Sequence, residues 1–415
     1  MADFEVHIDL EGRARQIGLA RSNHVRGRET IIFGYDDDWL EDPDRFSLEP
    51  ALALGRGTFA LPTGFATFGS IGDSAPDTWG RQLMQRAERR FAEREGRAVH
   101  TLLESDYLLG VMDETRLGAL RFRWAGDSTF QAPLCTGVPT LIELARLLRI
   151  TERLLRDEET DEDIQLIFAP GSSLGGARPK ASVVDQHGHL SIAKFPKETD
   201  DYCMETWEEI AMRLAGEAGI ATPVHYLIDV AGKKVMLSRR FDRQGAIRVP
   251  FLSAMAMMGA KDGERGSYPE IVDVLSEHGA QGKRDAHALY RRVVFNVLIS
   301  NVDDHLRNHG FLWFGRAGWS LSPAYDLNPV PVDLKARVLT TNIDLDEGTC
   351  SLDLLEAACG FFALTLAQAR SVIREVATAT ATWRDTAKAV GARTGEIDRM
   401  ASAFEHDDLK RALAL

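Results

Sequence analysis

The chain has 415 residues, of which 44% are hydrophobic and 27% charged, so its composition is that of a globular protein with a sizeable core. Its net charge of −13 argues against a broad basic face for nucleic acid, because that affinity comes largely from Lys and Arg on phosphates. No apolar run approaches the roughly 18 residues that span a bilayer. The acidic start MADFEVHIDLEGR also differs from a signal peptide. We therefore expect a cytoplasmic protein with no membrane partner, whose four cysteines are reduced because they form no CxxC pair.

The first third of the chain is expected to begin with strands and to continue with helices. Residues 4–8 alternate apolar and polar side chains, and residues 30–35 continue the strand-rich start. The further elements expected there are helices at 77–98, 101–110 and 141–158, a strand at 118–124 and a linker at 127–139.

Residues 169–180 (APGSSLGGARPK) form a loop of small residues, which we expect between two strands at 163–168 and 181–184. Glycines let backbone N–H groups approach phosphates, and successive amides can form an anion-binding concavity. The loop is not a Walker A sequence, because Ala177-Arg178 stands where Lys-Ser/Thr is required. It is not a dinucleotide fingerprint either, because no acid follows in a βαβ context. A hairpin over nucleotide phosphates and a flexible surface loop both stay open.

Lys194 lies in the next expected strand, residues 190–195, on the same pleat face as Leu190 and Ile192. A lysine on an apolar strand face is unfavourable unless its ammonium group meets an anion. We expect phosphates and a carboxylate on the following helix, residues 205–218, with Glu208 as the candidate and Glu209 as the alternative. An edge-strand lysine that reaches water is the competing interpretation.

After a hairpin formed by residues 224–230 and 234–238, the pattern is mainly helical from Leu252 to the end. One apolar helix runs into FNVLISNVDDHLRN, with Asp303, His305 and Asn308, and a strand pair then leads to Asp326 in SPAYDL. Protein kinases need these parts in this order: an Asp that accepts the hydroxyl proton, an Asn on one Mg²⁺ and a later Asp on the bridging Mg²⁺. A polar loop with capping residues is the alternative.

Two other functions fit some of these residues. His305 and His309 are spaced like the ligands of a zinc hydrolase, but Leu306 stands where a HExxH helix carries Glu, and a strand is expected next. A nucleotide-binding corepressor with weak or no kinase activity would keep all the same residues. A nucleophilic hydrolase has less support, because no GxSxG motif is present.

The motifs together resemble the HipA family of bacterial toxin kinases, and the resemblance covers nearly the whole chain. The matching segments are SLGGARPK at 173–180, IAKFP around Lys194, LSRRFDR at 237–243, NVDDHLRNHGF at 301–311, LSPAYDL at 321–327 and GDSAPDTWGRQ at 72–82.

The resemblance implies a Ser/Thr protein kinase that uses ATP and Mg²⁺ and acts as the toxin of a toxin–antitoxin pair. Asp303 would be the catalytic base, with His305 supporting the loop, and Asn308 and Asp326 would hold the metal. The backbone near Arg239, Arg240 and Phe241 would hold the adenine. The residues assigned to the phosphates are Gly171, Ser172, Ser173, Gly175, Gly176, Lys180 and Lys194. Ser173, or its neighbour Ser172, would be autophosphorylated, and the added charge would switch the kinase off.

Family members are paired with a helix-turn-helix antitoxin, so we expect a HipB-like partner and contact with DNA only through it. The protein substrate is expected to be a translation component such as an aminoacyl-tRNA synthetase. Asp304 is expected either to share the metal or to face solvent. Arg178, Arg239, Arg240 and Arg307 are candidates for additional phosphate contacts.

The expected fold is α/β (α+β), with a bilobal protein-kinase-like core. The expected parts are an N-terminal β-rich extension at residues 1–125, a β-rich small lobe at 126–238 and a mainly helical large lobe at 239–415.

Overall fold

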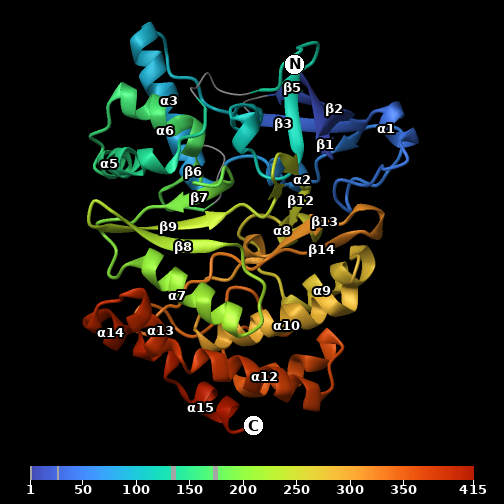
Figure 1. Cartoon of the computed structure of the whole chain (residues 1–415). Coiled ribbons are helices and arrows are strands. Elements are labelled where there is room, and N and C mark those ends of the chain that lie inside the picture. Colours follow the sequence, from blue (N-terminus) through green and yellow to red (C-terminus); the bar gives the residue numbers. More distant parts are fainter. Residues whose placement is uncertain (1, 26–27, 132–136, 172–175) are drawn as a thin grey trace. The chain divides into compact units, whose positions relative to one another are not determined.

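The computed structural model describes residues 2–25, 28–131, 137–171 and 176–415. The chain forms two compact units: the first comprises Met1–Thr199 with Ile228–Leu252, and the second Asp200–Leu227 with Ser253–Leu415. Both sheets of four or more strands contribute to the first unit, while the second is mainly helical (Figure 1). In the described ranges, no helix combines the length and the apolar character needed to cross a membrane.

An antiparallel sheet begins the first unit, with strand order β4-β3-β2-β1-β5. Phe4, Val6 and Ile8 are almost completely buried, which confirms the strand expected from the alternation at residues 4–8. The strands are β1 Ala2–Leu10, β2 Arg13–Val25, β3 Arg28–Tyr35, β4 Phe59–Ala60 and β5 Leu120–Trp124. The short helices beside them are α1 Asp37–Glu41, α2 Gly69–Gly72, α4 Glu104–Leu109 and the 3₁₀ turn Asp113–Thr115.

Three longer helices of the first unit share a core: α3 (Thr78–Glu95), α5 (Leu144–Leu155) and α6 (Asp161–Gly171). Figure 1 shows them grouped together. Helix α5 follows the 3₁₀ turn Leu141–Glu143, and α3 ends at Gly96 in the left-handed conformation. The expected helices at 77–98 and 141–158 are therefore confirmed.

Helix α6 corrects one expectation, because residues 163–168 were expected to be a strand. Thr160 and Asp163 form reciprocal side-chain-to-backbone bonds (Asp163 N to Thr160 Oγ1, 3.2 Å; Thr160 N to Asp163 Oδ2, 3.0 Å). This is the arrangement of a capping box, and the acidic first turn also favours a helix N-terminus. The small-residue loop therefore follows a helix, and the expectation that it joins two strands is wrong.

A second sheet of the first unit has the strand order β6-β7-β9-β8. Its strands are β6 Lys180–Val184, β7 Leu190–Lys194, β8 His225–Val230 and β9 Lys233–Arg239. They confirm the four strands expected in this region. Short strands follow: β10 Arg243–Gln244, β11 Ile247–Arg248 and β12 Phe251–Ser253.

The second unit consists of helices around one antiparallel hairpin, β13 with β14. Side-chain caps begin several of its helices; Ser267 with Glu270 and Thr365 with Gln368 form capping boxes. Its first elements are α7 Met204–Glu217, α8 Ala254–Met257, α9 Tyr268–His278, α10 Gly282–Leu298, the 3₁₀ turn Leu306–Asn308, β13 Gly310–Trp313, the 3₁₀ turn Gly315–Ala317 and β14 Trp319–Leu321. The C-terminal elements are α11 Leu352–Ala358, the 3₁₀ turn Cys359–Phe362, α12 Leu366–Thr380, α13 Trp383–Val390, α14 Thr394–Phe404 and α15 Asp407–Leu413.

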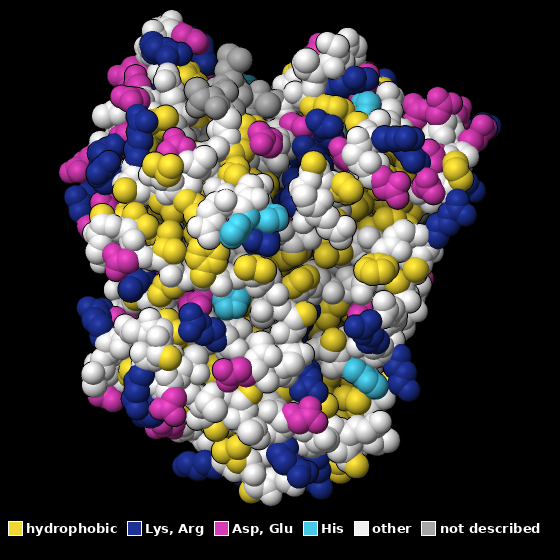
Figure 2. Space-filling model, viewed as in Figure 1, with side chains coloured by type: hydrophobic (Ala, Val, Ile, Leu, Met, Phe, Trp, Pro, Cys, Tyr) yellow, Lys and Arg dark blue, Asp and Glu magenta, His cyan; other side chains and the backbone are white. Residues whose placement is uncertain are grey.

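Charged side chains of both signs are interspersed on the face that Figure 2 shows, and its described residues form no continuous basic patch. This distribution agrees with the net charge of −13. It gives no support on this face to direct binding of nucleic acid.

Candidate active site

Helix α10 leads into the loop that carries the expected catalytic residues. Its final turns are fully buried, from Val293 to Leu298, so the loop starts from a fixed point in the core. Asp303 lies beyond this anchor with 64% of its side chain exposed, and its Oδ1 is 3.0 Å from Nζ of Lys335. An exposed carboxylate of this kind can be approached by a hydroxyl group of another molecule.

The two expected metal ligands, Asn308 and Asp326, are in direct contact. Nδ2 of Asn308 donates to Oδ2 of Asp326 at 3.1 Å, although the residues are 18 positions apart. Oδ1 of Asn308 accepts a bond from the backbone N–H of His305 at 2.9 Å. Asp326 adopts a φ of +60°, which a residue with a side chain seldom takes and which often marks a functional position. The sequence-based expectation that these two residues converge agrees with this geometry.

Asp304 does not face solvent, so that expectation is wrong, whereas its sharing of the metal stays a prediction. Its side chain is buried, and its Oδ2 accepts bonds from the hydroxyl of Tyr268 and from Nε2 of His309, the latter at 2.7 Å. Its backbone oxygen accepts from Oγ1 of Thr341 at 2.7 Å. Burial is the main cause that raises the pKa of Tyr268 well above its usual value, and the neighbouring charge of Asp304 raises it further. Asp304 therefore fixes the base of the loop.

His305 supports the loop mainly through its backbone. Its N–H donates to the side chain of Asn308, and its carbonyl oxygen accepts from the backbone N–H of Asn308 at 2.8 Å. The zinc-hydrolase interpretation required His305 and His309 on one helical face. Only the 3₁₀ turn Leu306–Asn308 separates them, and His309 is buried against Asp304. Among the described residues, no cluster of three or more His, Cys, Asp or Glu side chains suits a metal ion.

Three asparagines that the sequence analysis did not single out connect this region. Nδ2 of Asn301 donates to Oδ1 of Asn296 at 3.0 Å, and Oδ1 of Asn301 accepts from the backbone N–H of Asn328 at 3.1 Å. Nδ2 of Asn328 donates to Oδ1 of Asp326 at 3.2 Å, and Nδ2 of Asn296 donates to the Tyr268 hydroxyl at 3.3 Å. Buried amides need such partners. The sequence offered one signal for this network, namely an asparagine, Asn296, within the apolar end of a helix.

Lys194 lies at the end of β7 in the first unit, where Lys180 of β6 and Met236 of β9 are directly opposite it. The strand's burial pattern leaves Leu190, Ile192 and Lys194 half-buried on one face, as expected. Because residues opposite each other across a sheet share a face, the side chains of Lys180 and Lys194 start from neighbouring positions on it. Such a face favours an anion.

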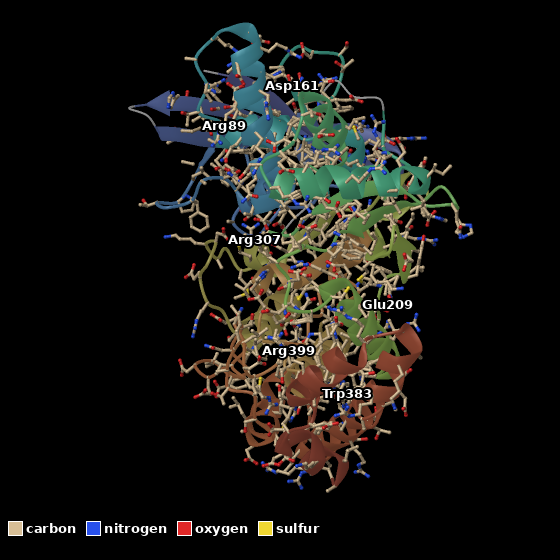
Figure 3. All side chains as sticks on the ribbon, turned by 90° about the vertical axis from the view of Figure 1, so that its left-hand side faces the viewer. Arg89, Asp161, Glu209, Arg307, Trp383 and Arg399 are labelled. Carbon is tan, nitrogen blue, oxygen red and sulfur yellow. The ribbon has the colours of Figure 1, made fainter. Side chains whose placement is uncertain are left out.

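Both candidates for the carboxylate partner of Lys194, Glu208 and Glu209, lie on α7. Glu209, labelled on α7 in Figure 3, accepts bonds from Nε of Arg213 and Nδ1 of His225, both at 2.7 Å. Burial raises its pKa, but the hydrogen bonds from His225 and Arg213 outweigh burial, and the net pKa is lowered. With Glu209 engaged within the second unit, Glu208 stays the prediction.

The loop residues expected on phosphates are only partly described. Gly171 is the last residue of α6, whereas Ser172, Ser173 and Gly175 lie outside the described residues. The N–H of Gly176, which was expected to face phosphate, instead donates to Oδ2 of Asp77 at 2.8 Å. Lys180 is 8% exposed and begins β6.

The LSRRFDR segment after β9 also differs from expectation at Arg240. Its backbone N–H donates to the Leu190 oxygen at 2.9 Å, and its buried guanidinium group binds Asp242 and the carbonyl of Thr115. Burial alone would raise the pKa of Asp242, but the charges of Arg240 and Arg243 lower it to about 2. The guanidinium group of Arg240 is therefore engaged within the protein and not available to phosphate, whereas the backbone contact of this residue with adenine stays a prediction.

Two more of the arginines proposed for phosphate form ion pairs with carboxylates. Arg239 donates to Oδ2 of Asp185 at 3.1 Å, and Nε of Arg307 lies 3.3 Å from Oδ1 of Asp262. Their charges are therefore partly neutralised within the protein. The cysteines agree with the expected reduced state: Cys350 and Cys359 are free and buried and Cys203 is free and half-buried, while Cys135 lies outside the described residues.

A family model described as the HipA-like C-terminal domain matches residues 172–383. That stretch is more than half of the chain and contains Lys194, Asp303, Asn308 and Asp326. The chain belongs to the HipA family. The expected family is thereby confirmed.

Curated proteins similar to this HipA-family chain are named putative kinases. One from Haemophilus influenzae is 24% identical over 212 residues, which are 44% of this chain and 61% of that protein. Putative kinase Y4dM of Sinorhizobium fredii is 35% identical over 33% of this chain and 36% of its own length, and Y4mE is 23% identical over 72% and 71%. The chain thus spans less than two thirds of the length of the first two relatives.

A solved structure of HipA from Shewanella oneidensis MR-1, in complex with HipB and its operator DNA, resembles this HipA-family chain over its whole length. The TM-score is 0.65 at 18% identity, and the match covers 99% of this chain and 96% of that one. The likeness concerns the fold. It confirms the expected α/β, kinase-like architecture.

Proposed function

We propose that the protein is an ATP- and Mg²⁺-dependent serine/threonine protein kinase and the toxin of a HipA-type toxin–antitoxin pair. The observation that supports this most is the contact of Asn308 with Asp326, 3.1 Å apart, in the same unit as the exposed Asp303. A base for the attacking hydroxyl, an amide ligand and a second carboxylate ligand are the parts that phosphoryl transfer requires. The relatives' names support the same activity.

The donor set fits Mg²⁺, which binds oxygen and often takes only one or two carboxylates besides the phosphates. Asn308 and Asp326 would hold it, and the ion would neutralise charge on the transferred phosphoryl group. In this structure the amide nitrogen of Asn308 faces Asp326. If the Asn308 side chain turned its oxygen towards the ion, it would give up both the Nδ2 bond to Asp326 and the Oδ1 bond from the His305 N–H.

Asp303 would accept the proton of the substrate hydroxyl, which requires it to leave the exposed ion pair with Lys335. Such pairs contribute only about 0–1 kcal/mol, so a substrate can displace the lysine. Lys194, with Lys180 opposite it, would bind the nucleotide phosphates. The backbone near Arg239, Arg240 and Phe241 stays the proposed contact for adenine. Domain boundaries after residues 125 and 238 belong to the same proposal.

Regulation and partners are also proposed from the family. Autophosphorylation of Ser173 or Ser172 would add about −1.5 to −2 charges beside the phosphates and switch the kinase off. HipA of Shewanella oneidensis is found with HipB and operator DNA, so a HipB-like helix-turn-helix antitoxin is the proposed partner. DNA would be bound only through it. A cytoplasmic location and an aminoacyl-tRNA synthetase as substrate complete the proposal.

The decisive experiment compares the wild type with Asp303→Asn, using labelled ATP and Mg²⁺ for transfer and calorimetry for nucleotide binding. We expect Asp303→Asn to bind nucleotide normally and to lose transfer by roughly 10²–10⁴-fold, the usual contribution of a general base. Asp385→Asn, an exposed carboxylate on α13, is the matched control and should transfer normally. A wild type that binds nucleotide but transfers no phosphate would favour the corepressor. Stoichiometric zinc without nucleotide binding would favour the hydrolase.

A further inference from the structure

The end of the small-residue loop is bonded to the start of α3, about 100 positions earlier in the chain. Oδ2 of Asp77 accepts from the N–H of Gly176 at 2.8 Å, and the backbone N–H of Trp79 donates to the oxygen of Gly176 at 3.1 Å. The indole Nε1 of Trp79 donates to the oxygen of Lys180 at 2.9 Å. Asp77, the N-cap of α3, and Trp79 in its first turn thus hold both ends of the segment Gly176–Lys180.

The helix before the loop rests on the same support. Ile164 and Ile167 of α6 pack with Trp79 and Leu83 of α3 in one buried cluster. Trp79 is only 4% exposed, so its indole ring is fixed when it donates to Lys180. Helix α3 therefore fixes the chain on both sides of the loop, through packing before it and through hydrogen bonds after it.

Gly176 occupies a position that favours a residue without a side chain. Its φ of +84° belongs to the left-handed region, where glycine is favoured. A Cβ added there would lie 2.6 Å from Nζ of Lys180, so the absent side chain makes room for that ammonium group. Lys180 in turn lies opposite Lys194. Asp77 and Trp79 therefore act, through Gly176, on the position of both lysines.

We propose that Asp77 and Trp79 are positioning residues: they place the lysines that bind the triphosphate of the nucleotide, and they do not touch the triphosphate themselves. They hold Gly176–Lys180, and with it the Lys180–Lys194 pair, in the arrangement that binds anions. A ligand that meets a preformed pair of cations does not have to order them, and its affinity is higher for that reason. This inference rests on the proposed function, because it assumes that a nucleoside triphosphate is the ligand.

The test measures the dissociation constant of Mg·ATP by calorimetry, and KM and kcat separately, for Asp77→Ala, Asp77→Asn and Trp79→Phe. We expect Asp77→Ala to weaken Mg·ATP binding about tenfold, the effect of one lost hydrogen bond to a charged group. Trp79→Phe, which removes the indole donor and keeps a ring in the core, should weaken it about threefold. Asp77→Asn keeps one oxygen acceptor and should lie between wild type and alanine. KM for ATP should rise in parallel while kcat stays within about twofold, since Asp77 touches no group that reacts.

Asp36→Ala is the control for a lost helix cap. Asp36 caps α1 by accepting from the N–H of Asp38 at 3.0 Å, as Asp77 caps α3 by accepting from Thr78. The Asp36→Ala variant should have a lower melting temperature and an unchanged affinity for ATP. Wild-type affinity in both Asp77→Asn and Trp79→Phe would overturn the inference, even if Asp77→Ala fails to fold. A wild type that binds no Mg·ATP would instead overturn the proposed function on which the inference depends.

Discussion

The two groups of proposed site residues are held in different ways. In the second unit, some of the bonds join residues that are close in the sequence: Asn301 with Asn296, five positions apart, and Asn308 with Asp326, 18 apart. In the first unit, Gly176 is bonded to Asp77 at a separation of 99 positions. The loop that carries Asp303 combines these local bonds with longer-range ones from Tyr268, Thr341 and Arg337, all within the second unit. The lysines proposed to bind phosphate depend on a helix from a distant part of the chain.

The largest effect expected from this comparison separates two neighbouring carboxylates of the catalytic loop. Asp304→Ala leaves Tyr268 and His309 without their buried partner and should lower the free energy of unfolding by about 3–5 kcal/mol. Asp303→Ala, at an exposed position, should change it by less than about 0.5 kcal/mol. Urea unfolding measures both. If the Asp304→Ala and Asp303→Ala variants were equally stable, the bonds of Asp304 with Tyr268 and His309 would not be what holds the loop.

The second prediction tests a distant support of the catalytic loop, where Arg337 joins Ser300 to α15 and His406. Burial is the main cause that lowers the pKa of His406 to about 4, and the charge of Arg337 lowers it further. An unfolded histidine takes up a proton below about pH 6.5, whereas this one stays neutral in the folded protein. His406 therefore contributes stability above pH 6.5 that is lost as the pH falls towards 4, by about 2–3 kcal/mol.

Urea unfolding of the wild type and of His406→Gln at pH 7.5 and pH 4.5 checks this prediction. The acid loss should be smaller in the variant, since glutamine does not titrate. Asp408 and Arg337 also face His406, and both variants retain them. The same pH dependence in both proteins would contradict the assignment to His406.

The third prediction concerns the long-range contact in the first unit. Gly176→Ala should lower the free energy of unfolding by about 1–2 kcal/mol, because alanine is strained at positive φ and its Cβ meets Lys180. It should also weaken ATP binding. Gly188→Ala is the matched control, at a φ of +80° with no atom within 4 Å of the added Cβ. An equal loss of ATP affinity in both variants would mean that the Lys180 contact is irrelevant.

The smallest effect is expected at Lys335. Its ion pair with Asp303 is exposed on both sides, at 56% and 64%, and solvent screens such pairs. Lys335→Ala should therefore change the free energy of unfolding by less than about 0.5 kcal/mol in urea. A loss above 1 kcal/mol would show that Lys335 does more than neutralise the exposed base.

The sequence predicted the parts of the molecule that depend on neighbouring residues. The strands at 181–184 and 190–195 were expected as two runs joined by a turn, and the meeting of Asn308 with Asp326 was expected from the order of a helix, a loop and a strand pair. Residues 163–168 were misassigned because an apolar run of that length suits a strand or a buried helix, and the cap at Thr160 was overlooked.

Other features could not be predicted because they depend on tertiary contacts. Two adjacent aspartates give no sequence signal of which one is buried, and the burial of Asp304 follows from Tyr268 and His309. The capture of the Gly176 N–H by Asp77 required knowledge of which helix lies beside the loop. The hydrogen bonds of Arg240 with Asp242 and Thr115 could not be predicted either, because they too depend on the tertiary fold.

The contrast between Asp303 and Asp304 has a practical consequence for labelling chemistry. A water-soluble carbodiimide with a small amine modifies carboxyl groups that solvent can reach. It should attack Asp303, whose side chain is 64% exposed, and spare Asp304, whose side chain is 3% exposed. If the carboxyl group of Asp303 becomes protected from this modification, a molecule has bound directly over it.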